Sequence, residues 1–382
     1  MSPLFRLPFR SDPGMILHVI AFLLAITPLW PQAQFHVERD KVFASEGDVV
    51  SSEIKLFPAK KEAGRIFVQP LSFPGARTVQ FHFRVVQAAP GWRIRFVDRK
   101  GREMWSVSSD TVGTDFWSDE IKVADAQLEL WSDVADNQVQ IIVPEVLRND
   151  HKFVPQAIIN QMPVPITGQS PEIQKWGKAV ARLKIAGNDK KGWYCTGFLV
   201  DTNVLMTNRH CVHSESEMQS AILYFDYDGK TTPVKSNLLE QLQCDEGLDF
   251  ALFRVSAISQ RPSLKLANIR DLSDVPKLLL IEHPGGEVKK VSIAGCIVRG
   301  VHLTGLSDQQ TDFGHRCDTL GGSSGSPVMN LISGEVVGLH HEGTIGTDPQ
   351  LANQAVYMGL ILDKMRDTTD ASNRQCSFQP HH

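Results

Sequence analysis

The chain has 382 residues, of which 42% are hydrophobic and 21% are charged, and its formal net charge is -4. This length allows roughly two or three domains with buried cores, and the composition excludes disordered and collagen-like classes. A small net charge without a basic or acidic run predicts neither a nucleic-acid partner nor an anionic membrane surface as partner. The function must therefore be argued from particular motifs.

Residues 1–34 have the three-part form of a secretory signal peptide. Arg6 and Arg10 precede an apolar run over 15–30, and a short segment with a small residue follows. The run is shorter than the roughly 20 apolar residues that a membrane span needs. We therefore expect an exported protein, secreted or periplasmic, with no stable membrane span after the signal is removed.

Residues 35–146 show the two-residue alternation of strands that bury one face. Apolar and polar residues alternate over 79–85 and over 92–96, and a charged turn follows at 98–103. Several short strands separated by turns favour a β-sandwich. Because no catalytic motif occurs in this segment, we interpret it as an accessory domain or a pro-domain.

Prolines recur from Pro144 to Pro171, which predicts an extended linker over residues 147–171. From residue 172 to residue 382, short apolar runs return, separated by Gly, Pro, Asp and Asn. This second segment has no long stretch with the 3.6-residue period of a helix. We therefore expect an all-β protein with its second domain over residues 172–382.

All six cysteines lie in the second half of the chain: Cys195, Cys211, Cys244, Cys296, Cys317 and Cys376. An exported protein meets an oxidising compartment, so these cysteines are candidates for disulfides, with free thiols as the alternative. No pair has the C-x-x-C spacing of a metal site. We predict no metal and no other cofactor.

Three segments carry the residue types of an activated serine. The segment LMTNRHCV contains His210, LDFALFRV contains Asp249, and GGSSGSP contains Ser324. A serine nucleophile needs a base within hydrogen-bond reach, a carboxylate that orients the base, and backbone N–H groups for the oxyanion. Together the segments resemble the trypsin-like serine peptidases of the chymotrypsin fold, in particular their bacterial glutamyl-endopeptidase branch, over roughly 172–370.

The resemblance implies a two-barrel peptidase domain behind the β-sandwich, and a role for each matching residue. Ser324 would be the nucleophile, His210 the base, and Asp249 the carboxylate that orients His210. The N–H groups of Gly322 and Ser324 would form the oxyanion hole. The HPGG turn at 283–286 matches a family turn without a chemical role.

Neighbouring residues of the same types match the family less well. His213 lacks the flanking cysteine pair, and Asp245 and Glu246 do not lead directly into an apolar strand. Ser323 and Ser326 take positions that the family fills with residues that are not nucleophiles. Trypsin has an aspartate at the position of Ser323 and uses it to bind a new N-terminus, so that activation switch cannot operate here.

The resemblance also implies one disulfide, because Cys195 and Cys211 match the pair that holds the histidine loop of the family. Beyond this pair, the sequence leaves the connectivity open. One arrangement joins Cys296, after the HPGG turn and its strand, to Cys317 in the loop before the nucleophile, which leaves Cys244 and Cys376.

The specificity pocket is ambiguous at this stage. Thr319 and His340 match the hydroxyl residue and the histidine that bind an acidic P1 side chain in glutamyl endopeptidases. Asp318, however, falls where trypsin has the aspartate that selects Lys and Arg. Backbone groups of one short segment would pair with the substrate as an added strand: His341, Glu342 and Gly343.

We therefore predict an exported serine endopeptidase that acts on proteins or peptides through an acyl-enzyme and prefers acidic P1 residues. One alternative is a peptidase with basic P1 preference. Another is a catalytically silent binding protein with a peptidase fold. No feature of the sequence predicts an oligomeric state.

Overall fold

The computed structural model describes most of the chain, in these ranges: 45–58, 61–76, 78–121, 126–149, 158, 160–187, 191–258, 260–275, 277–343 and 352–367. All of these residues belong to one compact unit. The predicted signal peptide lies outside them.

Among the described residues, none of the helices combines the length and the apolar character that crossing a membrane requires.

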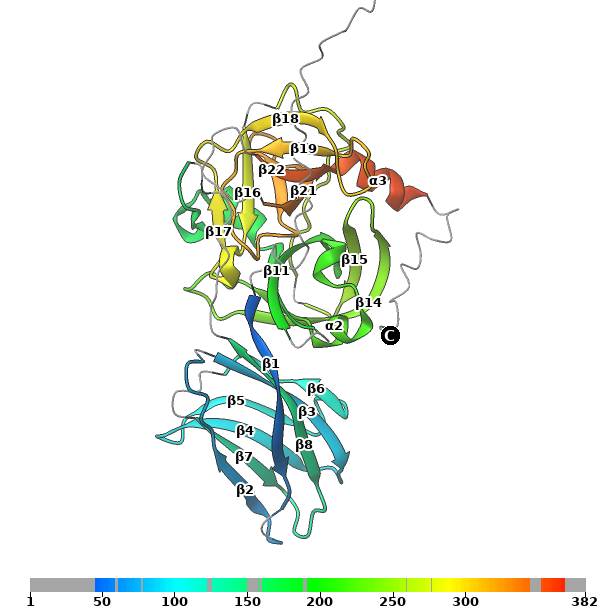
Figure 1. The fold of residues 1–382 in the computed structure, drawn as a ribbon. Helices are drawn as coiled ribbons and strands as arrows, with labels where there is room; N and C mark the ends of the chain where they lie inside the picture. Colours follow the sequence, from blue (N-terminus) through cyan, green and yellow to red (C-terminus); the bar gives the residue numbers. More distant parts are fainter. Residues whose placement is uncertain are drawn as a thin grey trace, which may run out of the picture. The chain divides into compact units, whose positions relative to one another are not determined.

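Two antiparallel sheets pack face to face in the first part of the chain (Figure 1). The first contains, in order, β1 (Ser45–Leu56), β8 (Gln140–Asn149), β3 (Thr78–Gln87) and β6 (Asp115–Trp117). The second contains β2 (Gly64–Pro70), β7 (Ala126–Ser132), β4 (Trp92–Asp98) and β5 (Glu103–Ser108). Phe81 of β3 and Phe96 of β4 meet between the sheets, with ring centroids 4.7 Å apart. The alternation in the sequence therefore predicted a β-sandwich correctly.

Parts of the proline-rich stretch lie in regular elements, while residues 150–157 and 159 of the predicted linker lie outside the described residues. Pro144 lies inside β8, where the pairing with β1 and β3 is irregular, and such bulges are where a strand accepts proline. β8 continues to Asn149 because Val146 and Leu147 are buried. Three short elements follow: β9 (Val164–Pro165), η2 (Ile166–Gly168) and α1 (Pro171–Gly177).

A six-stranded barrel forms the next part of the chain. Its strands follow the order β10 (Val180–Ala186), β13 (Ile222–Phe225), β14 (Val234–Asp245), β15 (Phe250–Val255), β12 (Val204–Thr207) and β11 (Lys191–Asp201). Pairing of β10 with β11 closes it. The 3-10 helix η3 (Arg209–Cys211) follows β12, and α2 (Glu215–Ser220) begins at a capping box on Ser214.

The remaining strands form an eight-stranded sheet, curved into a half-barrel. Their order is β18 (Val298–Leu303), β19 (Asp312–His315), β22 (Asn353–Tyr357), β21 (Val336–Glu342), β20 (Pro327–Asn330), β16 (Leu278–Glu282), β17 (Lys290–Ser292) and β9. The short helix η4 (Pro284–Gly286) follows β16, and α3 (Met358–Arg366) follows β22. Barrel and half-barrel confirm the predicted all-β, chymotrypsin-like architecture.

Several contacts connect the sandwich strands to the barrel, among them a strand pairing and a buried charged cluster. The first residues of β1 pair with β11, and the rest of the strand pairs with β8 (Figure 1). Glu120, between β6 and β7, accepts hydrogen bonds from Arg182 Nη2 and Lys184 Nζ, each at 2.8 Å, and from the Tyr194 hydroxyl. Burial alone would raise the pKa of Glu120, but these two cations hold it well below its ordinary value.

Candidate active site

The pairing of two strands brings His210 and Asp249 together. β12 and β15 are antiparallel, with Thr207 opposite Ala251. His210 follows the end of β12 in η3, and Asp249 directly precedes β15, so both lie at the same end of this pair. The pairing of these two strands thus brings together two residues that are far apart in the sequence.

Asp249 contacts His210 through both carboxylate oxygens. Oδ2 accepts from the ring Nδ1 at 2.6 Å, and Oδ1 accepts from the backbone N–H of His210 at 2.9 Å. Asp249 is only 2% exposed. Burial alone would raise its pKa, but the neighbouring His210 and His341 rings hold the pKa of Asp249 well below its ordinary value. An ionised Asp249 can fix the ring so that Nε2 acts as a base.

Ser324 lies beside the same end of the barrel. Its carbonyl accepts from the N–H of Thr196 at 2.8 Å and lies 3.9 Å from Cys211 Sγ. Cys195 and Cys211 form a disulfide, as the resemblance implied. Because Cys195 adjoins Thr196 and Cys211 adjoins His210, this disulfide connects the residues that hold Ser324 and His210.

The other cysteines have similar structural positions. Cys296 and Cys317 form a second disulfide, between the loop that follows β17 and the loop before Ser324. Cys244 is also disulfide-bonded. Its predicted partner, Cys376, lies outside the described residues.

The loop around Ser324 uses some of its backbone N–H groups within the fold and leaves others without an acceptor. Those of Ser323, Gly325 and Ser326 donate to carbonyl groups. Within the described part of the chain, the N–H groups of Gly322 and Ser324 have no acceptor. Gly322 has φ +93°, a conformation that favours glycine, and a Cβ there would lie 2.9 Å from a carbonyl oxygen. Two unused donors beside the predicted nucleophile are what an oxyanion hole requires.

A metal is not favoured at this site by the donor chemistry. The described residues contain a group of metal-ligating types at His210, Cys195 and Cys211. The two sulfurs of this group are joined in the disulfide, so neither is a thiolate that could bind a metal.

Asp318, the candidate residue for a trypsin-like specificity, has its carboxylate hydrogen-bonded to the backbone of another segment. It accepts from the N–H of Asn160 at 3.0 Å and from the N–H of Gln161 at 2.9 Å. The Asn160 side chain also donates to the carbonyl of Arg316. Asp318 is 1% exposed. The loop that carries Asp318 is therefore tied to residues 160–161.

His340 lies on β21 and is linked to a second buried histidine, His315 of β19. His340 Nδ1 lies 3.1 Å from both the Gln354 carbonyl and His315 Nε2. Burial lowers the pKa of both rings, to about 3 for His315. His340 Nε2 has no hydrogen-bond partner among the described residues, and Thr319 is fully buried.

His341, expected to contribute only backbone groups, also has a buried side chain. His341 makes contacts that differ from those of His340, at a point where the pairing of β21 with β22 shifts its register. Its Nε2 donates to Asp312 Oδ2 at 2.6 Å, and its Nδ1 lies 3.5 Å from Asp249 Oδ2. Glu342 and Gly343 follow it at the end of β21. The two consecutive histidines, His340 and His341, were the signal in the sequence for this second buried ring.

A buried glutamate under the Ser324 loop was also missed. Ser323 Oγ donates to Glu282 Oε2 at 2.5 Å, and Ser292 Oγ lies 3.1 Å from Glu282 Oε1. Glu282 is fully buried at the end of β16, and burial raises its pKa to about 8. Ser323, which has an aspartate counterpart in trypsin, is therefore hydrogen-bonded to a neutral carboxyl group at neutral pH.

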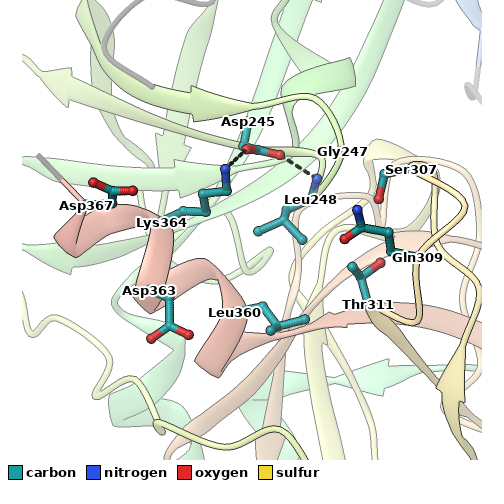
Figure 2. Close-up of a pocket in the computed structure, with 10 residues that line it drawn as sticks. All are labelled: Asp245, Gly247, Leu248, Ser307, Gln309, Thr311, Leu360, Asp363, Lys364 and Asp367. Atoms are coloured by element: carbon teal, nitrogen blue, oxygen red, sulfur yellow. Dashed lines mark hydrogen bonds and ion pairs between the residues drawn. The ribbon is translucent and has the colours of Figure 1, made fainter. Parts of the chain in front are cut away.

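A separate pocket of about 410 Å³ opens between the barrel, the loop before β19 and α3. Figure 2 shows Lys364 of α3 reaching toward Asp245, with 3.3 Å between Nζ and Oδ2. Leu248 and Thr311 line it and adjoin Asp249 and Asp312, but none of the predicted catalytic or specificity residues does.

Part of the sequence matches a family model. Residues 195–339 match the trypsin-like peptidase domain. This range contains His210, Asp249 and Ser324. This segment of the chain is therefore similar to trypsin-like peptidase domains.

Comparison with known proteins adds distant relatives. The chain is 25% identical over 206 residues to the secreted RxLR effector protein 73 of Plasmopara viticola. The match covers 48% of this chain and 50% of that protein, so the chain spans about half the length of this curated relative. The HtrA-type protease AlgW with tripeptide has 15% identity, covers 53% of this chain and 63% of its own, and has a TM-score of 0.41. The active form of the Rv3671c protease from M. tuberculosis has 18% identity, coverage of 60% and 94%, and a TM-score of 0.40.

Proposed function

We propose that the protein is a serine endopeptidase in which Ser324 attacks the peptide carbonyl. His210 takes the serine proton and then gives it to the leaving amine, which leaves an acyl-enzyme. Water, activated by the same ring, hydrolyses the acyl-enzyme. Asp249 holds the ring and stabilises its charged form, and the N–H groups of Gly322 and Ser324 stabilise the oxyanion.

The observation that carries this proposal is the convergence of two features at one end of the barrel. The Asp249 carboxylate binds both the ring and the backbone of His210. Beside them, the Ser324 loop keeps the N–H groups of Gly322 and Ser324 without acceptors among the described residues. A silent binding protein has no need of either feature.

The decisive experiment compares the unchanged chain with Ser324→Ala in two assays, hydrolysis of a casein substrate and labelling by a fluorophosphonate probe. We expect hydrolysis and labelling from the unchanged chain, and neither from the variant. Ser326→Ala is a matched control in the same loop and should keep the label. An unlabelled, inactive wild type with a normal melting curve would instead support the silent binding protein. Full hydrolysis by Ser324→Ala would refute the proposed nucleophile.

For specificity, we propose an acidic P1 residue. Asp318 is already bound by two backbone N–H groups, which leaves it poorly suited to a Lys or Arg side chain. His340 donates from Nδ1 to a carbonyl, so in its neutral form Nε2 presents a lone pair. A P1 carboxyl group can bind there only together with a proton, either its own or one on the ring.

The test is a set of fluorogenic peptides that differ only at P1 (Glu, Asp, Lys, Arg and Phe). We expect Glu to be cleaved best, with a kcat/KM that falls as pH rises because the bound proton becomes harder to supply. His340→Gln should reduce the preference for Glu over Phe. A preference for Lys or Arg would refute the acidic pocket and favour Asp318.

We also propose that the protein acts outside the cell that makes it. The disulfides are typical of an oxidising compartment. The similar protein from Plasmopara viticola is named as a secreted effector. N-terminal sequencing of the exported form would test this, and an N-terminus near residue 35 is expected.

A further inference from the structure

One buried charged pair in the described part of the chain has no role in the proposed reaction, although it touches the site. Asp312 begins β19 and is fully buried, and His341 of β21 is 3% exposed. Their side chains are joined by the 2.6 Å hydrogen bond from Nε2 to Oδ2. Burying a charged pair is costly, and only good geometry with further hydrogen bonds compensates that cost.

The pair is oriented by contacts at both of its ends. Thr311 Oγ1 donates to Asp312 Oδ1 at 2.8 Å, so both carboxylate oxygens of Asp312 are engaged. At the other end, His341 Nδ1 lies 3.5 Å from Asp249 Oδ2, the same oxygen that accepts from His210 Nδ1. The four side chains form a continuous line: His210, Asp249, His341 and Asp312.

This geometry determines the charge of the His341 ring. Burial alone favours a neutral ring, but Asp312 and Asp249 raise the pKa of His341 well above its ordinary value. His341 is therefore a cation between two carboxylates, with its positive Nδ1 end toward Asp249.

We propose that His341, held by Asp312, is a positioning residue that orients the Asp249 carboxylate and partly compensates its charge. This inference rests on the proposed function, because it concerns the same His210–Asp249 pair. With Oδ2 shared between the two rings, the carboxylate cannot rotate away from His210.

Other titratable groups face His341 and must be considered in any pH experiment. They come from the elements packed around it: Asp249, His210, Asp312, His315, His340 and Glu342. Burial raises the pKa of Glu342. Burial also keeps His315 and His340 neutral.

The experiment measures kcat and KM for the full chain and for Asp312→Asn, which keeps the His341 ring and a hydrogen-bond acceptor but removes the charge. We expect kcat to fall about tenfold, because the Asp249 carboxylate is held less firmly against His210. KM should not change.

His82→Gln is the matched control, because it breaks the His82–Asp115 contact in the sandwich. It should leave kcat unchanged. If His341→Gln folds, judged by its melting curve, it should lower kcat without changing KM, as Asp312→Asn does. A lower melting temperature with an unchanged kcat would overturn the inference, since it would show a structural role only.

A second readout does not depend on catalysis. The proton between His210 Nδ1 and Asp249 should give a low-field proton NMR signal, and its chemical shift should change in Asp312→Asn but not in the control. If the wild type hydrolyses no peptide, the proposed function fails, while the NMR comparison still tests the positioning role. If the wild type is active and neither readout changes, only the positioning role fails.

Discussion

Replacing Glu282 by Gln should make the protein more stable at alkaline pH. In the neutral form of Glu282, the proton on Oε1 can donate to Ser292 Oγ, whose own proton goes to the Asp318 carbonyl at 2.6 Å. Oε2 meanwhile accepts from Ser323. A glutamine amide can make the same hydrogen bonds, with its NH₂ group in place of Oε1. The substitution therefore keeps the shape of the side chain and removes its ionisable proton.

The magnitude follows from the pKa of Glu282, which burial raises from 4.5 to about 8. Below pH 4.5 the carboxyl is protonated in both the folded and the unfolded chain, so its full stabilising contribution is present. Between pH 4.5 and 8 the unfolded chain ionises while the folded chain keeps its proton, so this contribution is lost as pH rises. The loss reaches on the order of 4 kcal/mol near pH 8.

The assay is urea denaturation of wild type and Glu282→Gln at pH 4 and at pH 8. The difference in unfolding free energy between the two proteins should shift by about 4 kcal/mol in favour of the variant between these pH values. Glu287→Gln, at an exposed residue nearby, should show a shift of less than about 0.5 kcal/mol. An equal difference at both pH values would refute the idea that Glu282 is buried and neutral.

Three further substitutions test other parts of the structure. Asp249→Asn should lower kcat about ten-thousandfold with little change in melting temperature, because the neutral amide favours the wrong ring tautomer; unchanged kcat would exclude Asp249 from the reaction. Glu120→Gln should destabilise the fold by about 3–5 kcal/mol in urea denaturation, since Arg182 and Lys184 lose their shared carboxylate; a change below about 1 kcal/mol would mean that water solvates both cations. Gly325→Ala should prevent fluorophosphonate labelling, because a Cβ there would lie 2.0 Å from a carbonyl oxygen of β11; normal labelling would show that this loop can move.

The strands of the sandwich could be predicted because burial there follows a simple alternation. In β4, Trp92 and Ile94 are buried and Arg93 is exposed, as the two-residue period requires. The segments of His210 and Asp249 could be found because each lies next to an apolar strand that the sequence shows directly. Local pattern and local structure agree in these places.

The supporting residues could not be predicted, because their partners lie far away along the chain. Asp312 and His341 are 29 residues apart, and the sequence offers no local reason to pair them. Glu282 did leave a signal, namely a carboxyl group within the apolar run LLLIEH. Such a group must be neutral or paired when its strand is buried. The sequence does not show which of these holds, because Ser292 and Ser323 lie on other segments.

The path of β1 has a consequence for limited proteolysis. This strand joins the β11 edge of the barrel and the β8 edge of the sandwich. A single cut in the segment after β8 would therefore leave two fragments that still share a hydrogen-bonded ladder. We expect such a nicked protein to migrate as one species on a native gel and as two bands under denaturing conditions. Maturation by that cut alone would produce a two-chain protein that retains its sandwich.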